Sequence, residues 1–279
     1  MILPNLMPVE CPVRFEQVTE TKFHEIDYAL MSSVFASHNA LGRFCDEGIY
    51  QADVLARLNE AGLGPIQTEV PVLISWKDFR KAYYLDLVVQ DGLVYELKTA
   101  NAIVGEHEAQ LLNYLLMLNL RHGKILNFRP ASVQHRFVST SLSLAERRRY
   151  VLRDALWREI CPDCAQLRTC LLELLRDWGV FLAVDLYQEA LVWFMGGEAH
   201  VARRVDLARS GIKLGSQRML MHAPSVAFKV TAATQHREYV ETHLRRLLAL
   251  TNLRALQWIN LNRFEVELTT LFRHGGTAM

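Results

Sequence analysis

The chain has 279 residues, of which 51% are hydrophobic and 22% are charged, with 31 Lys and Arg residues against 30 Asp and Glu residues. This length fits one large domain or two smaller ones, and the composition is that of a globular protein, which excludes an intrinsically disordered chain. The net charge of +1 excludes nucleic-acid binding through overall charge, so such binding would need a local basic patch.

Three further features bear on cellular location. No apolar run reaches the roughly 18 residues that a membrane helix needs, so we expect no membrane span. The N-terminal segment has neither a basic start nor a compact apolar core, so it does not resemble a secretion signal. The five cysteines are few and odd in number, which predicts a reducing, cytoplasmic location rather than a disulfide framework.

The first half of the chain reads as a mixed α/β unit. Three prolines before residue 20 predict an irregular lead-in, because proline disrupts a helix interior. Apolar residues at helical spacing predict helices, alternating patterns predict strands, and Asp91-Gly92 predicts a hairpin turn between two of these strands. The expected elements are a broken helix over 21–61, strands over 68–76, 82–89 and 93–100, a helix over 106–120 and a strand over 124–128.

The second half is predicted to hold another α/β region. A polar, Arg-rich stretch over 141–176 is expected to be a helical linker, so that the two domains would span 20–140 and 177–273. Within the second domain the pattern predicts a helix over 181–195, strands across 199–232, a helix over 237–250 and strands across 255–271.

Three charged residues in the predicted hairpin carry the strongest chemical signal. Glu96 and Lys98 point to one face of their strand because side chains repeat every two residues, and Asp86 lies on the partner strand within reach of that face. Two carboxylates suit a hard divalent cation such as Mg²⁺, which polarises a phosphodiester and lowers the pKa of a bound water. Lys98 could then orient or deprotonate that water and stabilise developing charge. The alternative is a solvated cross-strand ion pair.

Through this Asp…Glu-x-Lys pattern the chain resembles the PD-(D/E)XK nucleases, the restriction-endonuclease-like superfamily. Within that superfamily it most resembles the bacterial GxxExxY proteins. The resemblance covers about residues 20–140 and implies a mixed sheet flanked by helices. The matching segments are HNALG at 38–42, DEGIY at 46–50, TEVPV at 68–72, YYLDLVV at 83–89, VYELKTA at 94–100, EHEAQLLNYLL at 106–116 and KILNF at 124–128.

The resemblance implies a role for each residue of the motif. Asp86 and Glu96 would bind Mg²⁺ or Mn²⁺, Lys98 would be the catalytic lysine, and Glu47 would be the acidic residue contributed by the first helical segment. This sequence departs from the family pattern at the name-giving glycine, which is replaced by Phe44. From the residues alone, Glu47 could instead cap its helix or be solvated.

Three further residues match positions of RecB-like nucleases. Gln110 and Tyr114 form a Q-x-x-x-Y pattern that resembles the helix positioning the DNA and the metal site in those enzymes. His38 matches the position at which some of them supply a histidine metal ligand. Tyr114 could instead pack in the core, and His38 could be a buried turn histidine.

The resemblance therefore implies a metal-dependent nuclease that hydrolyses phosphodiester bonds, with DNA as the expected partner. The alternative is a non-catalytic nucleic-acid-binding or scaffold protein that retains the nuclease fold. The intact Asp86, Glu96 and Lys98 favour catalysis, because a scaffold has no need to bring three charges together on a strand pair.

A cysteine pattern in the second half suggests another cofactor. Cys161, Cys164 and Cys170 have the C-x₂-C-x₅-C spacing that resembles the three downstream ligands of a [4Fe–4S] cluster in some RecB-like nucleases. The favoured interpretation is different: LRTCLLELLRDWG reads as an amphipathic helix that buries Cys170 as a small hydrophobic residue.

The second half contains an approximate echo of the first. GRFCDEGIYQ at 42–51 resembles GVFLAVDLYQ at 179–188, and LNLRHGKILN at 118–127 resembles TNLRALQWIN at 251–260. If the echo reflects a repeat, Val184 stands in place of Glu47 and the Glu-x-Lys pair has no intact equivalent, so the second copy would be an inactive nuclease-like domain. Two unrelated α/β segments are the alternative.

Such a second copy could hold nucleic acid while the first one cuts. Arginine is the usual phosphate-binding side chain, although exposed arginines are also common on solvated helix faces. We therefore expect either a monomer whose two halves are arranged like the subunits of a dimer, or a homodimer. The candidate nucleic-acid-binding residues are Arg203, Arg204, Arg245 and Arg246.

Overall fold

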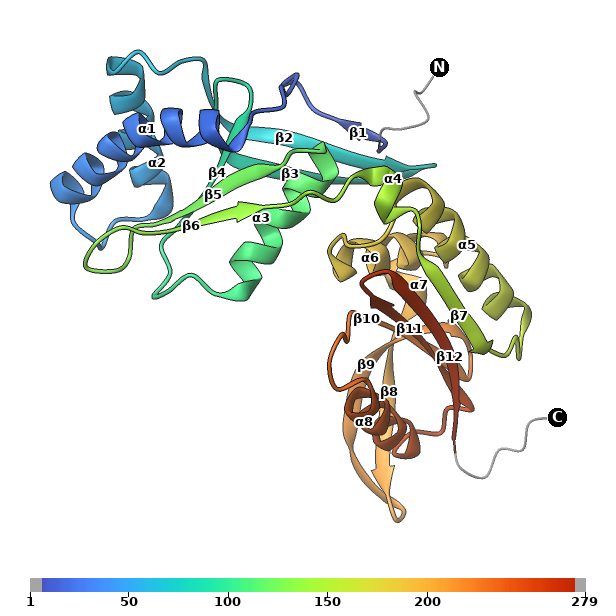
Figure 1. Cartoon of the computed structure of the whole chain (residues 1–279). Coiled ribbons are helices and arrows are strands. Elements are labelled where there is room, and N and C mark those ends of the chain that lie inside the picture. Colours follow the sequence, from blue (N-terminus) through green and yellow to red (C-terminus); the bar gives the residue numbers. More distant parts are fainter. Residues whose placement is uncertain (1–6, 274–279) are drawn as a thin grey trace. The chain divides into compact units, whose positions relative to one another are not determined.

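The computed structural model describes residues 7–273, which form two compact units that divide between Leu144 and Ala145. We call residues 1–144 the first unit and residues 145–279 the second unit. Each unit contains one six-stranded mixed sheet with helices packed against it (Figure 1). The sequence-based prediction of a mixed α/β protein with two sheet regions is therefore confirmed.

The first unit contains a sheet in the strand order β1-β2-β3-β4-β5-β6. All neighbouring strands are antiparallel except β4 and β5, which run parallel and are joined by helix α3, as a parallel pair requires a crossover connection. The elements are β1 (Val9–Glu10), α1 (Glu20–Leu41), α2 (Glu47–Glu60), β2 (Ile66–Trp76), β3 (Phe79–Val89), β4 (Leu93–Lys98), α3 (Gly105–Leu118), β5 (His122–Asn127) and β6 (Gln134–Ser139).

Helices cover both faces of this sheet. Side chains alternate between the faces of a strand, so the residues of β5 show which helix lies on which face. Lys124 contacts Asp27 of α1, and Leu126 belongs to the hydrophobic core that α1 and α2 form with the sheet. Gly123, which precedes Lys124 and lies on the other face, faces α3, where a Cβ atom would lie 3.1 Å from a methyl group of Leu111. The absence of a side chain at Gly123 thus lets α3 approach the sheet closely.

Both ends of α1 follow from local sequence. Thr19 caps the first turn by accepting a hydrogen bond from the backbone N–H of Lys22 at 3.2 Å, and serine or threonine is a preferred residue at this position. Gly42 ends the helix with φ +72°, in the left-handed region that glycine adopts at little cost. The predicted break near His38–Gly42 therefore falls at the end of α1.

The β3–β4 hairpin is present, but its turn is centred one residue earlier than predicted. Gln90 and Asp91 both have positive φ, and the N–H of Gly92 donates to the carbonyl of Val89, which makes Gly92 the last residue of the turn. A Cβ atom at Gly92 would lie 2.3 Å from a methyl carbon of Val18. Glycine is thus required here for packing against the N-terminal segment.

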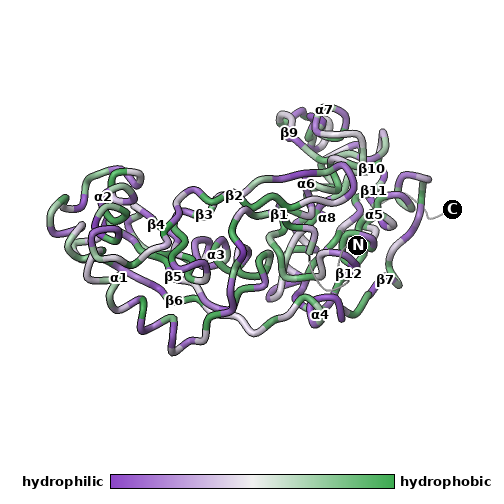
Figure 2. Tube along the Cα trace, turned by 90° about the horizontal axis from the view of Figure 1, so that it is seen from above, coloured by the Kyte–Doolittle hydropathy of each residue, from purple (hydrophilic) through white to green (hydrophobic). Residues whose placement is uncertain are grey.

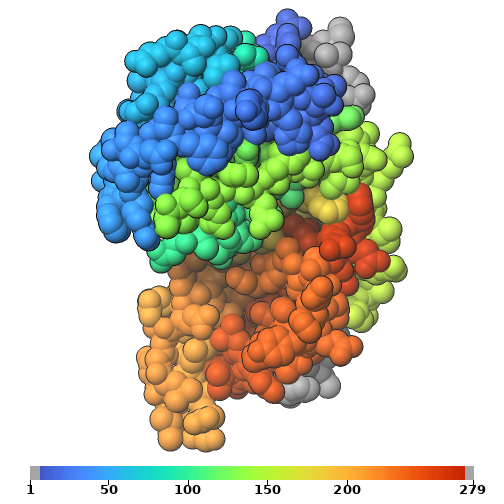
Figure 3. All heavy atoms as spheres, turned by 60° about the vertical axis from the view of Figure 1, so that its left-hand side comes forward, coloured from blue at the N-terminus to red at the C-terminus, as the bar shows by residue number. Residues whose placement is uncertain are grey.

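The second unit contains a sheet in the order β7-β12-β11-β10-β9-β8, with parallel pairs β10–β11 and β7–β12. Its central strand β10, like β4, is hydrophobic along most of its length (Figure 2). The β8–β9 hairpin projects from this unit (Figures 1 and 3). The elements are α4 (Leu144–Arg147), β7 (Val151–Leu156), α5 (Pro162–Trp178), α6 (Val184–Phe194), α7 (Glu198–Val201), β8 (Ala202–Arg209), β9 (Ile212–Ala223), β10 (Val226–Thr231), α8 (Arg237–Ala249), β11 (Ala255–Asn262) and β12 (Glu265–Phe272).

The stretch 141–176 differs from the predicted helical linker. It contains strand β7, which pairs with β12 at the edge of the second sheet, and most of helix α5, which packs in that unit. The residues of β7 alternate only between exposed and half-buried, so charged residues occur in the strand and its sequence lacks a clear apolar alternation.

Five strands of each sheet share one topology. The order β2-β3-β4-β5-β6 has the same strand directions as β8-β9-β10-β11-β12. Helices α1 and α2 precede the first set, α5, α6 and the short α7 precede the second, and one helix connects the parallel pair in each. The register of the parallel strands agrees as well. Asn127 and Asn260 end the two matched sequence segments, and they pair with Lys98 of β4 and with Thr231 of β10, respectively. The two segments matched in the sequence therefore occupy corresponding places.

No helix among the described residues is long and apolar enough to cross a membrane.

Candidate functional site

The predicted Asp, Glu and Lys residues meet where strands β3 and β4 diverge. Antiparallel pairing between these strands ends at Leu87 and Tyr95, and Asp86 and Glu96 lie just beyond this last pair. The backbone N–H of Leu97, which has no ladder partner on β3, donates instead to Oδ2 of Asp86 at 2.7 Å. The end of the strand pairing thus turns the Asp86 carboxylate toward β4.

Lys98 links the two carboxylates. Its Nζ lies 2.6 Å from Oε1 of Glu96 and 4.0 Å from Oδ2 of Asp86. The Glu96 side chain is 1% exposed, whereas those of Asp86 and Lys98 are 16% exposed. The site therefore has a buried floor at Glu96 and an accessible side where Asp86 and Lys98 meet solvent.

Burial and mutual repulsion shift the titration of the carboxyl groups. Burial raises the pKa of Asp86 to about 6, with the charge of Glu47 acting in the same direction. Burial and the charge of Asp86 raise the pKa of Glu96 to about 7. Burial alone would lower the pKa of Lys98, but its contacts with Glu96 and Asp86 outweigh that effect and raise it. Lys98 is therefore a protonated ammonium at neutral pH.

Helix α3 contributes the two residues of the Q-x-x-x-Y pattern. Gln110 and Tyr114 lie one helical turn apart, so their side chains share a face. The amide of Gln110 donates to Oε1 of Glu96 at 2.6 Å and to the hydroxyl of Tyr114 at 3.0 Å. The Tyr114 ring is 5% exposed and packs edge-on against Tyr83. Gln110 is thus in the site, while Tyr114 supports it from a largely buried position.

Glu47 lies in the first turn of α2, and its charge acts on Asp86, Glu96 and Lys98. The replacement of the family glycine by Phe44 does not prevent this helix, which begins after Asp46, because the Phe44 side chain is 79% exposed. Glu47 is therefore close enough to act on the carboxylate cluster, and its role in catalysis stays a prediction.

Two residues of this site were absent from the sequence-based set. Gln51, one turn after Glu47, donates to the backbone carbonyl of Asp86 at 2.9 Å and to Oε1 of Glu69 at 2.8 Å. Glu69 has φ +51° and lies opposite Asp86, at the one point where the ladder pairing of β2 with β3 is interrupted without a change of register. Its charge in an otherwise apolar strand was the signal that could have identified it.

His38 is placed differently from the other predicted ligands. It lies in the last turn of α1, and its Nε2 donates to the carbonyl of Pro130 at 3.1 Å, because a carbonyl oxygen can only accept. That nitrogen is therefore occupied. The role of His38 as a metal ligand stays a prediction, whereas its bond to the loop after β5 accounts for its burial.

The carboxylates fit a divalent cation. Oε2 of Glu96 is buried and has no hydrogen-bond partner, although a buried carboxylate oxygen normally requires one. Together with Asp86 it offers the hard oxygen ligands that Mg²⁺ and Mn²⁺ prefer. Asp86 and Glu96 would hold such an ion, and Asp86 and Lys98 are partly exposed to solvent.

The four candidate nucleic-acid-binding arginines have local partners or lie at the surface. Arg203 and Arg204, at the start of β8, donate to the backbone carbonyls of Ala199 and Ser216, and they line a hollow of about 570 Å³. In α8, Arg245 pairs with Glu241, and Arg246 is exposed.

The cysteines do not form the three-cysteine set of the cluster alternative, and Cys170 is buried in helix α5, as the favoured interpretation predicts. Among the described residues, the one group of three potential ligands consists of Cys161, Cys164 and His222, so the third ligand is His222 rather than Cys170. Cys170 lies six residues beyond Cys164 in α5, which places it about 9 Å farther along the helix axis. That separation explains why a single small site cannot include all three cysteines.

The comparison with protein-family models agrees with the geometry of the first unit. Residues 24–138 match the family model described as the PD-(D/E)XK nuclease superfamily. No curated protein matches the chain. The solved structure described as "Crystal structure of SSO0001" aligns with 46% of this chain and 81% of its own length, at 18% identity and a TM-score of 0.24. The family match and the Asp86, Glu96 and Lys98 cluster within it identify residues 24–138 as a PD-(D/E)XK nuclease superfamily domain.

Proposed function

We propose that the first unit is a metal-dependent nuclease that hydrolyses phosphodiester bonds in DNA, and that it is a GxxExxY-type member of the superfamily. The observation that carries the proposal is the convergence of Asp86, Glu96, Lys98 and Gln110 at the point where β3 and β4 diverge. Buried charges are costly, so a fold that needed only stability would gain little from placing them there.

Each residue has a distinct role in this proposal. A bound Mg²⁺ or Mn²⁺ would polarise the scissile phosphate and supply a water of lowered pKa. Asp86 and Glu96 hold the cation, and Gln110 fixes Glu96 through its 2.6 Å hydrogen bond. Lys98 keeps a proton on Nζ, so it donates hydrogen bonds to the attacked phosphate oxygens and opposes the charge that develops there.

The test is a cleavage panel with single- and double-stranded DNA and RNA in the presence of Mg²⁺ or Mn²⁺. We expect cleavage of DNA by the wild-type chain and its loss in Asp86→Asn and Lys98→Ala. The matched control is Lys229→Ala, which removes an exposed lysine at the position of β10 that corresponds to Glu96 in β4. This control should cleave at the wild-type rate.

A second readout separates catalysis from binding. Titration of Mn²⁺ followed by electron paramagnetic resonance should show one site that Asp86→Asn weakens and Lys98→Ala retains. Equal cleavage by all variants would indicate a contaminating nuclease. DNA binding without cleavage on any substrate would favour the non-catalytic nucleic-acid-binding protein instead.

We further propose that the second unit contributes to DNA binding through Arg203, Arg204, Arg245 and Arg246. Two of them, Arg203 and Arg204, line the same hollow, which places a positive charge beside a recess that an anion could enter. Replacing all four by glutamine should weaken binding to a similar extent for every DNA sequence and reduce the salt dependence of the affinity. Unchanged affinity at low salt would contradict this part of the proposal.

A further inference from the structure

The second unit contains a cluster of two thiols and one imidazole. Sγ of Cys161 lies 3.2 Å from Sγ of Cys164, which in turn lies 3.4 Å from Nε2 of His222. The candidate ligand atoms of the three residues all lie within 4.8 Å of one another. Cys164 and His222 are buried, and Cys161 is partly buried. The three side chains thus face a common point inside the unit.

Local structure explains how residues far apart in the sequence meet. Cys161 caps helix α5, Pro162 occupies its first position, and Cys164 lies in the first turn, so both thiols are at the same end of one helix. His222 lies on β9 at a shift in the β9–β10 register, where Met221 and Ala223 pair with successive residues of β10. Such a bulge redirects a side chain, and here it turns His222 toward the cysteines.

We propose that Cys161, Cys164 and His222 bind a zinc ion. Thiolate and imidazole are the ligands that Zn²⁺ favours, and C-x₂-C is a common spacing for a pair of them. With Zn–S of about 2.3 Å and Zn–N of about 2.0 Å, neighbouring ligands of a tetrahedral site lie about 3.5 to 3.8 Å apart. The observed separations of 3.2 and 3.4 Å differ from these values by about half an ångström or less.

The surroundings support a thiolate ligand. Gln257 of β11 donates from its side-chain amide to Sγ of Cys164 at 3.2 Å, and this amide is itself fixed by the Arg158 carbonyl and the Thr270 hydroxyl. A donor aimed at sulfur orients the ligand, as the outer contacts of metal sites do.

The fourth ligand comes from an adjoining hollow. His222 lines an open cavity of about 450 Å³ together with Asp163 and His200. The Asp163 carboxylate lies between the two cysteines in sequence, and its charge acts on His222. Asp163, His200 or a water molecule in this cavity can complete a four-coordinate site, and a water ligand would leave a position exchangeable with small molecules.

The consequence is a cross-link between distant parts of the second unit. The zinc would join the start of α5 to β9. Binding releases the thiol protons to solvent, and the binding free energy stabilises the folded unit. The site does not depend on the proposed nuclease activity of the first unit.

The experiment measures metal content in the full chain purified without chelators. We expect one equivalent of zinc by mass spectrometry of the metals, falling to background in Cys161→Ser, Cys164→Ser and His222→Gln. Cys170→Ser is the matched control, because Cys170 lies in the same helix and outside the cluster. Glu96→Gln is the second control, because zinc retained there cannot be bound by the carboxylates of the first unit.

A spectroscopic measurement keeps the proposal testable if a variant fails to fold. Wild-type chain reconstituted with Co²⁺ should show a thiolate-to-cobalt charge-transfer band that His222→Cys retains and intensifies. Zinc at background in the wild type, an absent charge-transfer band, or equal zinc in wild type and Cys161→Ser would overturn the proposal. A disulfide between Cys161 and Cys164 in the purified chain would also overturn it and indicate a redox pair.

Discussion

The two units contain the same supporting contacts at corresponding positions. In the first unit Tyr50 donates to the carbonyl of Gly42 at 2.6 Å and accepts from the N–H of Cys45. In the second unit Tyr187 donates to the carbonyl of Gly179 at 2.6 Å and accepts from the N–H of Leu182. Each tyrosine thereby joins the end of one helix to the start of the next.

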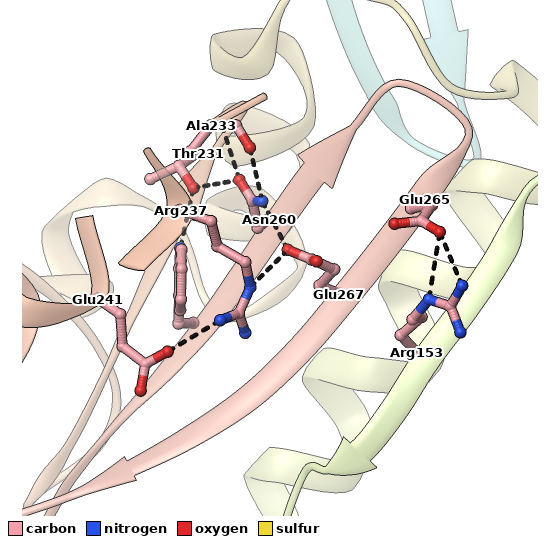
Figure 4. A network of polar contacts seen from close by, with 9 residues as sticks. Arg153, Thr231, Ala233, Arg237, Glu241, Asn260, Glu265 and Glu267 are labelled. Atoms are coloured by element: carbon pink, nitrogen blue, oxygen red, sulfur yellow. Dashed lines mark hydrogen bonds and ion pairs between the residues drawn. The ribbon is translucent and has the colours of Figure 1, made fainter. Parts of the chain in front are cut away.

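A second matched contact lies beside the parallel strand pair. The side-chain amide of Asn127 accepts from the N–H of Ala100 and donates to its carbonyl, and Asn260 makes the same two bonds with Ala233 (Figure 4 shows the second). In both units the asparagine fixes the chain just after the strand that carries, or would carry, the Glu-x-Lys pair. The scaffold around that position is therefore built in the same way twice.

The two units differ in the side chains that stand at the positions of the Asp86, Glu96 and Lys98 cluster. Register places Met219, Lys229 and Thr231 where the first unit has Asp86, Glu96 and Lys98. Thr231 accepts from the indole N–H of Trp258 and donates to Asn260, so its hydroxyl serves packing rather than ion binding. The second unit thus has no carboxylate at either of these positions, as the predicted inactive nuclease-like copy would require.

The opposite face of each sheet differs as well. In the first unit Asp27 of α1 forms a buried ion pair with Lys124 of β5 at 2.6 Å. The corresponding elements of the second unit, α5 and β11, present Cys164 and Gln257 in contact at 3.2 Å. The same location thus carries an ion pair in one unit and a metal-ligand candidate in the other. The same fold can carry different side chains at this location because the tyrosine and asparagine contacts shared by the two units do not involve these side chains.

The largest expected effect concerns the position held by Glu96 in β4 and by Lys229 in β10. Glu96→Gln should reduce DNA cleavage at least about a hundredfold, because the contribution of a metal ion is several kcal/mol. Lys229→Gln should leave cleavage unchanged. Initial rates on a fluorescent DNA substrate at saturating Mg²⁺ measure both. A similar loss of cleavage activity in the two variants would contradict the view that the first unit is active and the second is inactive.

The next effect concerns the buried ion pair. Asp27→Ala should destabilise the first unit by about 3–5 kcal/mol, because it leaves the charge of Lys124 buried without a partner. Hydrogen exchange of the α1 and β5 amides measures this change and leaves the second unit as an internal reference. The double variant Asp27→Leu/Lys124→Met should be destabilised much less. A cost below about 1 kcal/mol for Asp27→Ala would mean that the pair behaves as a surface salt bridge.

The asparagine pair tests whether the shared scaffold serves the active site. Asn127→Ala and Asn260→Ala should each cost about 1–3 kcal/mol, because each leaves two backbone groups without their partner. Only Asn127→Ala should also slow cleavage, because Ala100 follows Lys98 by two residues. Chemical unfolding and cleavage rates separate the two effects. Slowed cleavage in Asn260→Ala alone would contradict this view.

The tyrosine pair gives the smallest effect. Tyr187→Phe should cost about 1–3 kcal/mol, because the carbonyl of Gly179 is buried and would lose its donor. Tyr50→Phe should cost about 0.5–1.5 kcal/mol, because the carbonyl of Gly42 belongs to an exposed residue that water can reach. Hydrogen exchange at α2 and α6 measures each unit separately. Equal costs would show that exposure of the acceptor does not matter here.

Sequence patterns predicted most of the secondary structure because the elements are strongly amphipathic or continuously apolar. The helices before each sheet, the β3–β4 hairpin and the β10–α8–β11 order all follow from apolar spacing. The pattern failed at β7, an edge strand whose residues alternate only weakly in burial, so that it read as part of a helical linker. Edge strands lack the two buried faces that make central strands recognisable.

Some residues of the candidate site could likewise be predicted from the sequence and others could not. Glu96 and Lys98 could be paired from the sequence because two-residue spacing on a strand fixes a common face. Gln51 and Glu69 could not be predicted, because their place beside Asp86 depends on a local interruption of the β2–β3 pairing and on the packing of α2. His38 matched the position of a metal ligand in sequence, yet its Nε2 is bonded to Pro130, a loop residue that local patterns do not place.

The sequence by itself determined the α/β class, the order of most elements and the residues of the Asp86, Glu96 and Lys98 cluster, because these depend on local periodicity and on spacing along strands. Only the tertiary structure decided that residues 145–176 belong to the second unit, since β7 is recognised by its pairing with β12. Only the tertiary structure also brought His222 to Cys161 and Cys164, because a contact between a helix and a bulged strand depends on how the chain packs.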